Sequence, residues 1–355
     1  MSGDLLRRTC MPEEVQRWST PPATVLTGAT GWLGSALIEH LLASKRKGLR
    51  ALLRDGEDAS HLEQSGVEVV KGDISDKRAV ARLFDGIPPG ADVIHTAGVI
   101  HPKSLSEFTK VNANGTRYMV EVAQSASIRR MVHVSSNSPF GTNPVESETF
   151  RNQEPYNPYL GYGASKMQGE LAVLAGVEAG LDAVIVRPPW FYGPYQPARQ
   201  TTFFTMVRTG KFPMFGGGTQ RRSMVYVENL IQGVIAAELT IGVSGRGYWI
   251  ADERPYEVRE IVETVRRALT DEGYEVTGKP RSLPVIIANI AESADRALQR
   301  LGQYQQQVHV LGEMGHTIAC EISAAKAELG YEPEFELYGG MRRSIAWCRE
   351  QGIEL

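Results

Sequence analysis

Short apolar runs alternate with amphipathic segments along the first half of the chain. The apolar runs are nearly continuous, which is typical of strands covered on both faces of a parallel sheet. The segments between them repeat apolar residues three and four positions apart, which predicts helices. The predicted strands are residues 23–27, 50–54, 67–71, 93–96, 130–135 and 183–187, and the clearest predicted helices are residues 33–43, 111–125 and 161–178. This alternation predicts an α/β protein with a doubly wound parallel sheet.

The pattern loosens after Pro188, where loops rich in proline, glycine and aromatic residues replace it. We expect the chain to return to the sheet once, around residues 223–239 and 247–250. Residues 254–355 predict helices and short connections, with a late helix at 338–349. The second half therefore predicts a smaller, mostly helical region beside the sheet. Residues 1–22 precede the first strand and predict an extension that packs on the domain or trails from it.

Composition argues against several classes of protein. A net charge of −3 and a pI near 6.2 give no basic field for nucleic acid. The one tight basic run, residues 45–47, is expected at a helix end. The three cysteines lie far apart and predict reduced thiols and no metal site. We find no membrane span and no signal-peptide pattern, so we expect a cytoplasmic protein acting on a small molecule.

Three glycines follow the first predicted strand and open the first helix. Glycine permits a tight turn and lets backbone amides approach a pyrophosphate, and the helix N-terminus adds partial positive charge. A turn without a ligand is the alternative, but Asp73 follows the third predicted strand and Ala97-Gly98 follows the fourth, at the strand ends where such sheets bind ligands. We therefore expect a Rossmann dinucleotide site formed by Gly28, Thr30, Gly31, Trp32, Leu33, Gly34, Asp73, Ile74, Thr96, Ala97 and Gly98.

The end of the second predicted strand distinguishes NADP from NAD. An arginine there neutralises the 2′-phosphate of NADP, whereas a carboxylate accepts hydrogen bonds from the ribose hydroxyls of NAD. The chain has Leu53-Arg54-Asp55 at this point. Arg54 in the terminal position favours NADP, and a shift of one residue to Asp55 favours NAD. We favour NADP and leave NAD open, since Arg54 is otherwise a solvated side chain.

Tyr162 and Lys166 lie four residues apart on a predicted helix and so share one face. An unperturbed tyrosine has a pKa of about 10, too high for a good base near neutrality, and a close lysine together with the positive nicotinamide favours the phenolate. With the glycine turn and Ser135-Ser136 after the fifth strand, the pair resembles the extended short-chain dehydrogenase/reductase family, whose members are NAD-dependent epimerase/dehydratase-like enzymes. Further ordered matches are Gly72-Asp73, Asn112, Gly115-Thr116, Arg187-Pro188, Tyr192-Gly193-Pro194 and residues 226–230.

The resemblance implies a role for each matching residue. Ser136 is implied to hold the substrate oxygen, although Ser135 is one position away, and Tyr162 to exchange a proton with that oxygen. Lys166 is implied to anchor the nicotinamide ribose, and Asn112 to support the local helix and a water path. Tyr162, Lys166 and Pro188 join the implied cofactor site. Each residue alone is more often a packing or solvated side chain, but their joint order favours catalysis.

The resemblance also implies a division of the chain and an assembly. Residues 23–187 with about 223–250 are implied to form the dinucleotide-binding domain, and residues 188–222 with 251–355 the substrate-binding region. The helices at 111–125 and 161–178 pair across a two-fold axis in the family, which implies a homodimer.

Two features predict different substrates. Pro188-Pro189-Trp190 occupies the place where nucleotide-sugar enzymes of the family usually carry an asparagine, which favours an apolar wall, although Trp190 could equally be a core residue. A proline-led amphipathic stretch at 284–301 resembles the 3β-hydroxysteroid dehydrogenase and ketone reductase branch. Arg222, in contrast, lies in a segment where sugar epimerases bind nucleotide phosphates, or it forms an interdomain ion pair.

Our leading hypothesis is an NADP- or NAD-dependent oxidoreductase that interconverts a secondary alcohol and a ketone, with Pro189, Trp190, Arg222 and Ser136 facing the substrate. The first alternative is a nucleotide-sugar epimerase or dehydratase with bound NAD. The second is a dinucleotide-sensing protein without turnover, against which the complete catalytic set argues.

Overall fold

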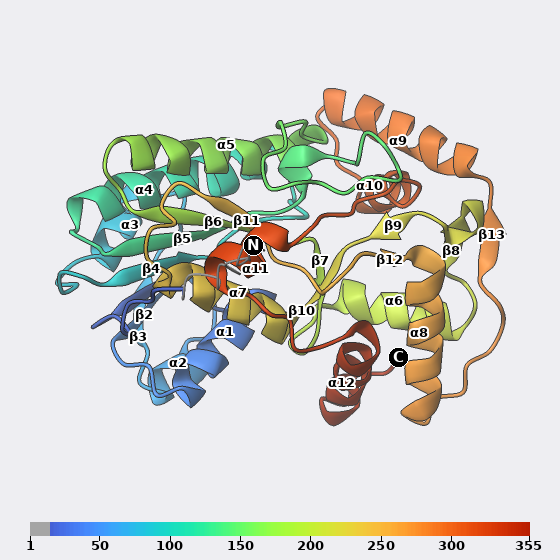
Figure 1. The fold of residues 1–355 in the computed structure, drawn as a ribbon, viewed down its shortest axis with the longest axis horizontal. Helices are drawn as coiled ribbons and strands as arrows, with labels where there is room; N and C mark the ends of the chain where they lie inside the picture. Colours follow the sequence, from blue (N-terminus) through green and yellow to red (C-terminus); the bar gives the residue numbers. More distant parts are fainter. Residues whose placement is uncertain (1–14) are drawn as a thin grey trace, which may run out of the picture.

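A parallel sheet between two helical layers dominates the computed structural model, which describes residues 15–355 (Figure 1). Within these residues the sheet has seven strands in the order β11-β6-β5-β4-β1-β2-β3, all pairs parallel. The strands are β1 (Thr24–Thr27), β2 (Leu49–Leu53), β3 (Glu68–Lys71), β4 (Asp92–His95), β5 (Arg130–Val134), β6 (Ala183–Arg187) and β11 (Gly247–Trp249). The predicted doubly wound α/β fold is confirmed, and its six predicted strands form with ends shifted by at most one residue.

Helices cover both faces of the sheet (Figure 1). One layer holds α1 (Trp32–Ala43), α2 (Ser60–Gln64) and α7 (Val227–Leu239), and the other holds α3 (Lys77–Leu83), α4 (Thr116–Ser125) and α5 (Leu160–Glu178). Successive residues of β1 point to opposite layers: Leu26 packs in the core with Leu37 of α1, and Val25 packs in the core with Val173 of α5. This alternation explains why apolar residues occupy adjacent positions in β1.

A π-helical stretch, Phe108–Gly115, precedes α4. The sequence predicts one regular helix over 111–125, so the change of helix type within it is not anticipated. π-Helical turns are rare and occur often at functional sites. Here the stretch carries Asn112 and packs along α5.

The second half builds a smaller region beside the sheet, as predicted. Its helices are α6 (Ala198–Arg208), α8 (Val258–Asp271), α9 (Val285–Arg300), α10 (Gln306–Glu313), α11 (Ser323–Leu329) and α12 (Leu337–Glu350). Its strands form three pairs, β7 (Trp190–Tyr192) with β10 (Met224–Tyr226), β9 (Arg221–Arg222) with β12 (Tyr256–Glu257), and β8 (Pro213–Phe215) with β13 (Arg281–Leu283). Short 3₁₀ turns occur at Ser138–Phe140 and Gly216–Gly218.

The predicted return of the chain to the sheet is correct for β11, which pairs with β6, and for α7, which packs on β5 and β6. The strand at the start of that segment, β10, pairs with β7 outside the main sheet. A pairing of only three residues depends on the path of the loop before it, and the apolar pattern of the sequence does not predict that path.

The end of α1 and the N-terminal segment add two contacts to this frame. The basic run follows α1 as expected, and the side chain of Arg46 is buried and pairs with buried Glu238 of α7 at 2.7 Å. The Trp18 amide donates to the Leu239 carbonyl, and the Arg130 guanidinium lies 4.4 Å above the Trp18 ring. Residues 15–22 of the predicted extension therefore pack on the sheet domain, whereas residues 1–14, with Cys10, lie outside the described residues.

The other two cysteines, Cys320 and Cys348, are buried free thiols. Among residues 15–355, no helix combines the length and the apolar character needed to cross a bilayer.

Candidate active site

The turn between β1 and α1 has no room for side chains. Gly28 has a φ of +75°, and a Cβ on Gly34 would lie 1.9 Å from the carbonyl oxygen of Gly28. The Gly31 amide donates to the same oxygen at 2.9 Å. Within the described chain no side chain caps the first turn of α1, so its free amides point at the space beyond the turn. This backbone cradle fits a pyrophosphate.

The other predicted cofactor residues lie around the same edge of the sheet. Thr96 donates through its hydroxyl to the Thr27 carbonyl at 2.7 Å, which holds the Thr96-Ala97-Gly98 segment against the glycine turn. Asp73 accepts from the Ser75 hydroxyl at 2.6 Å. Ile74 and Leu33 are buried, so only their backbones can reach a ligand.

Trp32 connects the cradle to the second region of the molecule. Its ring nitrogen donates to the Pro194 carbonyl at 2.7 Å, and its ring lies 4.3 Å from that of Phe191. The first residue of α1 therefore also helps to form the cavity described below.

Arg54 follows β2 directly, and its guanidinium bonds to Glu57 at 2.7 Å. The pKa of Glu57 is lowered because hydrogen bonds from Arg54 and from Thr30 outweigh its burial. Glu57 therefore lies between the glycine turn and the end of β2, where the adenosine ribose of a dinucleotide lies in such folds. Glu57 is not predicted from the sequence, because it lies in a polar loop with no periodic pattern.

Ser136 and Tyr162 meet on one wall of a cavity of about 800 Å³. Ser136 follows β5, and its hydroxyl lies 3.2 Å from the Ser138 hydroxyl. Burial raises the pKa of Tyr162 to about 12, and a hydrogen bond with Ser136 and the charge of Arg199 oppose that effect. Ser135 also lines the cavity, but within the described residues its buried hydroxyl has no partner.

Lys166 lies one turn after Tyr162 on α5 and is buried. Its ammonium donates to the Val134 carbonyl at 2.8 Å. Burial lowers the pKa of Lys166 to about 8, against the opposing charge of Glu170. The lowered phenol pKa that the sequence predicts is not found in the protein alone, where burial of Tyr162 dominates, and it stays a prediction for the complex with a cofactor.

Asn112 does not touch the phenol. Its amide group donates to the Val99 carbonyl at 2.9 Å and to the Ser165 hydroxyl at 3.0 Å, and its oxygen accepts from the Val99 amide at 2.8 Å. Asn112 thus joins the loop after β4 to α5, next to Lys166. This position agrees with a supporting role rather than a role in direct contact with the reacting atoms.

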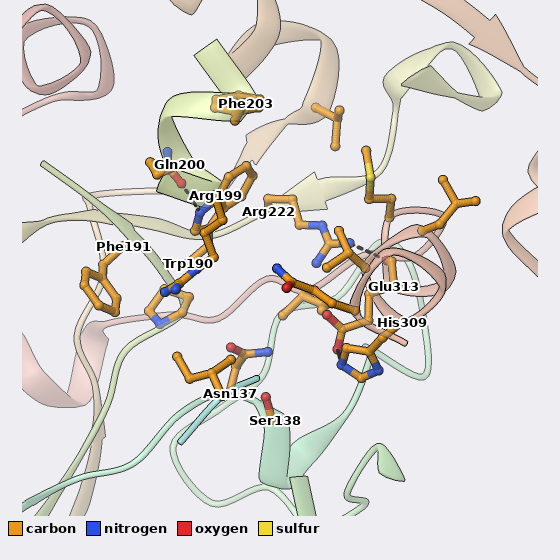
Figure 2. A pocket seen from close by; sticks show the side chains of 18 of the residues that line it. Asn137, Ser138, Trp190, Phe191, Arg199, Gln200, Phe203, Arg222, His309 and Glu313 are labelled. Carbon is orange, nitrogen blue, oxygen red and sulfur yellow. Dashed lines mark hydrogen bonds and ion pairs between the residues drawn. The ribbon is translucent and has the colours of Figure 1, made fainter. Parts of the chain in front are cut away.

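The cavity has mostly apolar and aromatic walls, and Pro188 and Pro189 line it. Trp190 donates to Gln200 at 3.1 Å and lies edge-on to Phe203, with ring centroids 5.1 Å apart. Figure 2 shows Trp190 and Arg222 among the side chains that line the cavity. Arg222 donates to the Glu313 carbonyl, and burial lowers its pKa.

Residues near the C-terminus also line the cavity, and they are not predicted from the sequence. His309 of α10 lines it, with Nδ1 2.7 Å from buried Asp295. Burial opposes protonation of His309, but the Asp295 hydrogen bond outweighs it, so the pKa of His309 is raised. The Tyr159 hydroxyl donates to the same carboxylate at 3.2 Å, one turn before Tyr162. Tyr159 lies 136 residues before Asp295 in sequence, and no local motif marks the group.

The chain is similar to known proteins over most of its length. A sequence model described as the NAD dependent epimerase/dehydratase family matches residues 24–250. The chain is 45% identical over 343 residues to an uncharacterized protein, y4nL, of Sinorhizobium fredii, covering 93% of this chain and 96% of that one. It is 29% identical over 316 residues to a 4-hydroxy-2-methyl-3-oxo-4-farnesyl-3,4-dihydroquinoline-1-oxide ketoreductase of Stigmatella aurantiaca, covering 87% and 91%.

Solved structures share the fold. The crystal structure of a dTDP-glucose 4,6-dehydratase, DesIV, from Streptomyces venezuelae with NAD and TYD bound superposes with a TM-score of 0.71 at 24% identity. It covers 92% of this chain and 97% of the dehydratase. These relatives include both a ketoreductase and a nucleotide-sugar enzyme, so they do not separate the two substrate classes.

Proposed function

Because the chain belongs to the NAD-dependent epimerase/dehydratase family, we propose that it is an oxidoreductase that interconverts a secondary alcohol and a ketone on an apolar, steroid-like skeleton. One observation carries the proposal: Ser136 and Tyr162 share a wall of a large, mostly apolar cavity that begins beside the glycine cradle. The farnesylated substrate in the name of the Stigmatella relative supports an apolar substrate.

The proposed chemistry assigns one task to each side chain. When bound, NADP or NAD supplies or accepts the hydride. Ser136 donates a hydrogen bond to the substrate oxygen and fixes its position. Tyr162 donates a proton to that oxygen during ketone reduction and accepts one during alcohol oxidation. Lys166, held by the Val134 carbonyl, provides the buried positive charge that favours the phenolate.

The glycine cradle and the Arg54 position support a dinucleotide, and we propose NADP as the preferred one. The cradle fits the pyrophosphate because a Cβ on Gly28 or Gly34 would collide with backbone atoms. Arg54 directly follows β2 and carries an exposed guanidinium at the position that favours a 2′-phosphate. Glu57 pairs with Arg54 in this structure, so the 2′-phosphate of NADP would have to compete with the Glu57 carboxylate for the Arg54 guanidinium.

A second candidate function rests on Arg222. Its guanidinium lines the cavity, where it could bind an anionic group such as a nucleotide diphosphate. This supports the alternative of a nucleotide-sugar epimerase or dehydratase. Tightly retained NAD in the purified protein and a thermal shift with uridine diphosphate would favour this alternative.

Replacement of Tyr162 tests the proposal. We expect the protein to oxidise NADPH with at least one ketone from a panel of rigid apolar ketones that includes 3-ketosteroids. Tyr162→Phe should lower kcat by roughly 100-fold or more, because proton transfer by a positioned side chain contributes about that much. Cofactor affinity, measured by NADPH fluorescence, should change little. Tyr195→Phe, at a partly exposed tyrosine, is the control. Full activity of Tyr162→Phe would overturn the assignment.

A further inference from the structure

Four large apolar side chains are exposed on the first two turns of α9. Val285, Ile286, Ile287 and Ile290, named here the α9 patch, have 37%, 61%, 37% and 62% of their surface exposed. Residues 284–291 contain no charged side chain, and Ala288 packs inward. Contiguous exposed apolar surface of this kind marks an interaction site in a protein that otherwise buries such residues.

The charges around the α9 patch are basic. Lys279 and Arg281 precede α9 and are exposed, and among the described residues neither has an ion-pair partner. The two acids of α9 are already engaged. Glu292 pairs with Arg296 at 2.6 Å and with His316 at 2.9 Å, and buried Asp295 pairs with His309. An apolar helix face beside unpaired cations complements a partner that has an apolar interior and a negatively charged surface layer.

The α9 patch adjoins the cavity of the candidate active site. Strand β13 leads into α9 and pairs with β8, whose Phe215 lines the cavity. Val285 packs against Gly216, since a Cβ there would lie 2.8 Å from the valine methyl. On α10, which packs along α9, Val310 lines the cavity and is 40% exposed. Figure 1 shows α9, α10 and β13 on the same side of the molecule.

We propose that the α9 patch docks this protein onto an anionic lipid bilayer, next to the side on which the cavity reaches the surface. The isoleucines enter the boundary between head groups and acyl chains, as apolar faces of interfacial helices do, and Lys279 and Arg281 contact the anionic head groups. A compound dissolved in the bilayer then has a short path to the apolar cavity. This proposal does not depend on the chemistry assigned to Tyr162.

Vesicle co-sedimentation of the full chain tests the proposal. We expect binding to vesicles of mixed phosphatidylglycerol and phosphatidylcholine, and much weaker binding to phosphatidylcholine alone. The double variant Ile286→Ser/Ile290→Ser should weaken binding to the mixed vesicles by about tenfold or more. The apolar surface of the two isoleucines, which binding would remove from water, is then absent. Lys279→Gln/Arg281→Gln should weaken binding to the mixed vesicles by roughly tenfold and leave the weak binding to neutral vesicles unchanged.

Ile241→Ser is the matched control, because Ile241 is 39% exposed but lies outside the α9 patch. It should bind vesicles like the parent protein, and NADPH affinity should be equal in all variants, which shows that the folds are intact. The proposal fails if the parent protein ignores the mixed vesicles or if the isoleucine variant binds them equally well. It also fails if light scattering shows that Ile286→Ser/Ile290→Ser separates a dimer, since the patch would then be covered by a second copy.

Discussion

Lys166 carries a buried charge that lowers stability. Burial lowers its pKa from 10.5 to about 8, so the protonated form is less favourable in the folded than in the unfolded chain. Each pKa unit corresponds to about 1.4 kcal/mol, which puts the cost near 3 kcal/mol at neutral pH. We therefore expect Lys166→Met to abolish turnover while raising the free energy of unfolding by about 1–3 kcal/mol at pH 7, measured by urea titration.

The pH dependence of this difference follows from the sign of the shift. Below pH 8 both states hold the proton and the cost is complete. Between pH 8 and 10.5 the folded lysine loses its proton before the unfolded one does, so the parent protein gains stability relative to Lys166→Met. The advantage of the variant should shrink over this range. A variant that is less stable than its parent at pH 7 would mean that the bond to Val134 outweighs burial.

The Arg54–Glu57 pair gives a test of cofactor preference. If Arg54 binds a 2′-phosphate, Arg54→Gln should weaken NADPH binding by roughly tenfold to 100-fold, the worth of a charge-assisted hydrogen bond, and leave NADH binding unchanged. Glu57→Gln should have the opposite effect, because it removes the carboxylate that occupies the guanidinium. Fluorescence titration with both nucleotides measures the ratio. Equal losses for NADH and NADPH would contradict the assignment.

At the scale of elements, the contact of α1 with β1 depends on Gly34. A Cβ at this position would lie 1.9 Å from the Gly28 carbonyl oxygen, which is backbone and cannot rotate away. Gly34→Ala should therefore move α1 from the turn, lower the free energy of unfolding by about 3 kcal/mol and abolish dinucleotide binding. Gly339→Ala on α12 is the control, since a Cβ there meets nothing within 4 Å and alanine should raise helix stability. A Gly34→Ala protein that binds NADPH normally would contradict this account.

The sequence predicts well the strands of the main sheet and the helix α5 that packs on it. Strands β1, β4, β5 and β6 are buried along their whole length and β2 nearly so, and α5 packs on β6, whereas the edge strand β3 is partly exposed. The pairing of β10 with β7 and the π-helical turn at Asn112 escape prediction. Both depend on contacts between distant segments rather than on local periodicity.

The candidate site divides in the same way. The glycine turn has a local geometry that excludes a side chain, whereas Ser136, Tyr162 and Lys166 are predicted from their order along the chain and their resemblance to the family pattern, and their roles stay predictions. Glu57 and His309 take part only because loops and helices from elsewhere bring them to Arg54 and Asp295. A polar residue in a loop is compatible with many partners, and its actual partner is known only from the folded structure.

At the scale of the whole molecule, the C-terminal helices are fastened to the helix that carries Tyr162. Asp295 of α9 accepts a hydrogen bond from the hydroxyl of Tyr159, the residue just before α5. Gln299 of α9 accepts one from the Gly161 amide in the first turn of α5, at 3.2 Å. His309 of α10 closes the group through the same carboxylate. Hydrogen bonds therefore join the helices α9 and α10, which lie beside the cavity, to the helix that carries Tyr162.

The outer face of α4 and α5 is where we expect a second copy to bind. The two helices pack tightly because Gly176 allows Val120 to approach, and a Cβ there would lie 2.5 Å from the valine methyl. Leu171 on α5 is 46% exposed, with partly buried Tyr118 and Leu174 on the same pair of helices. A two-fold pairing of this surface would bury these side chains against their own copies, and it would place a charge next to its equivalent if Leu171 became acidic.

Leu171→Glu should therefore convert a dimer to a monomer, which light scattering measures as a halved mass. Val145→Glu, at a site of similar exposure (47%) outside α4 and α5, should leave the dimer intact. Since one chain supplies all the residues of the proposed cofactor site, the monomer should keep its NADPH affinity. A parent protein that is monomeric at micromolar concentration, or a dimer that survives Leu171→Glu, would place the contact elsewhere or exclude it.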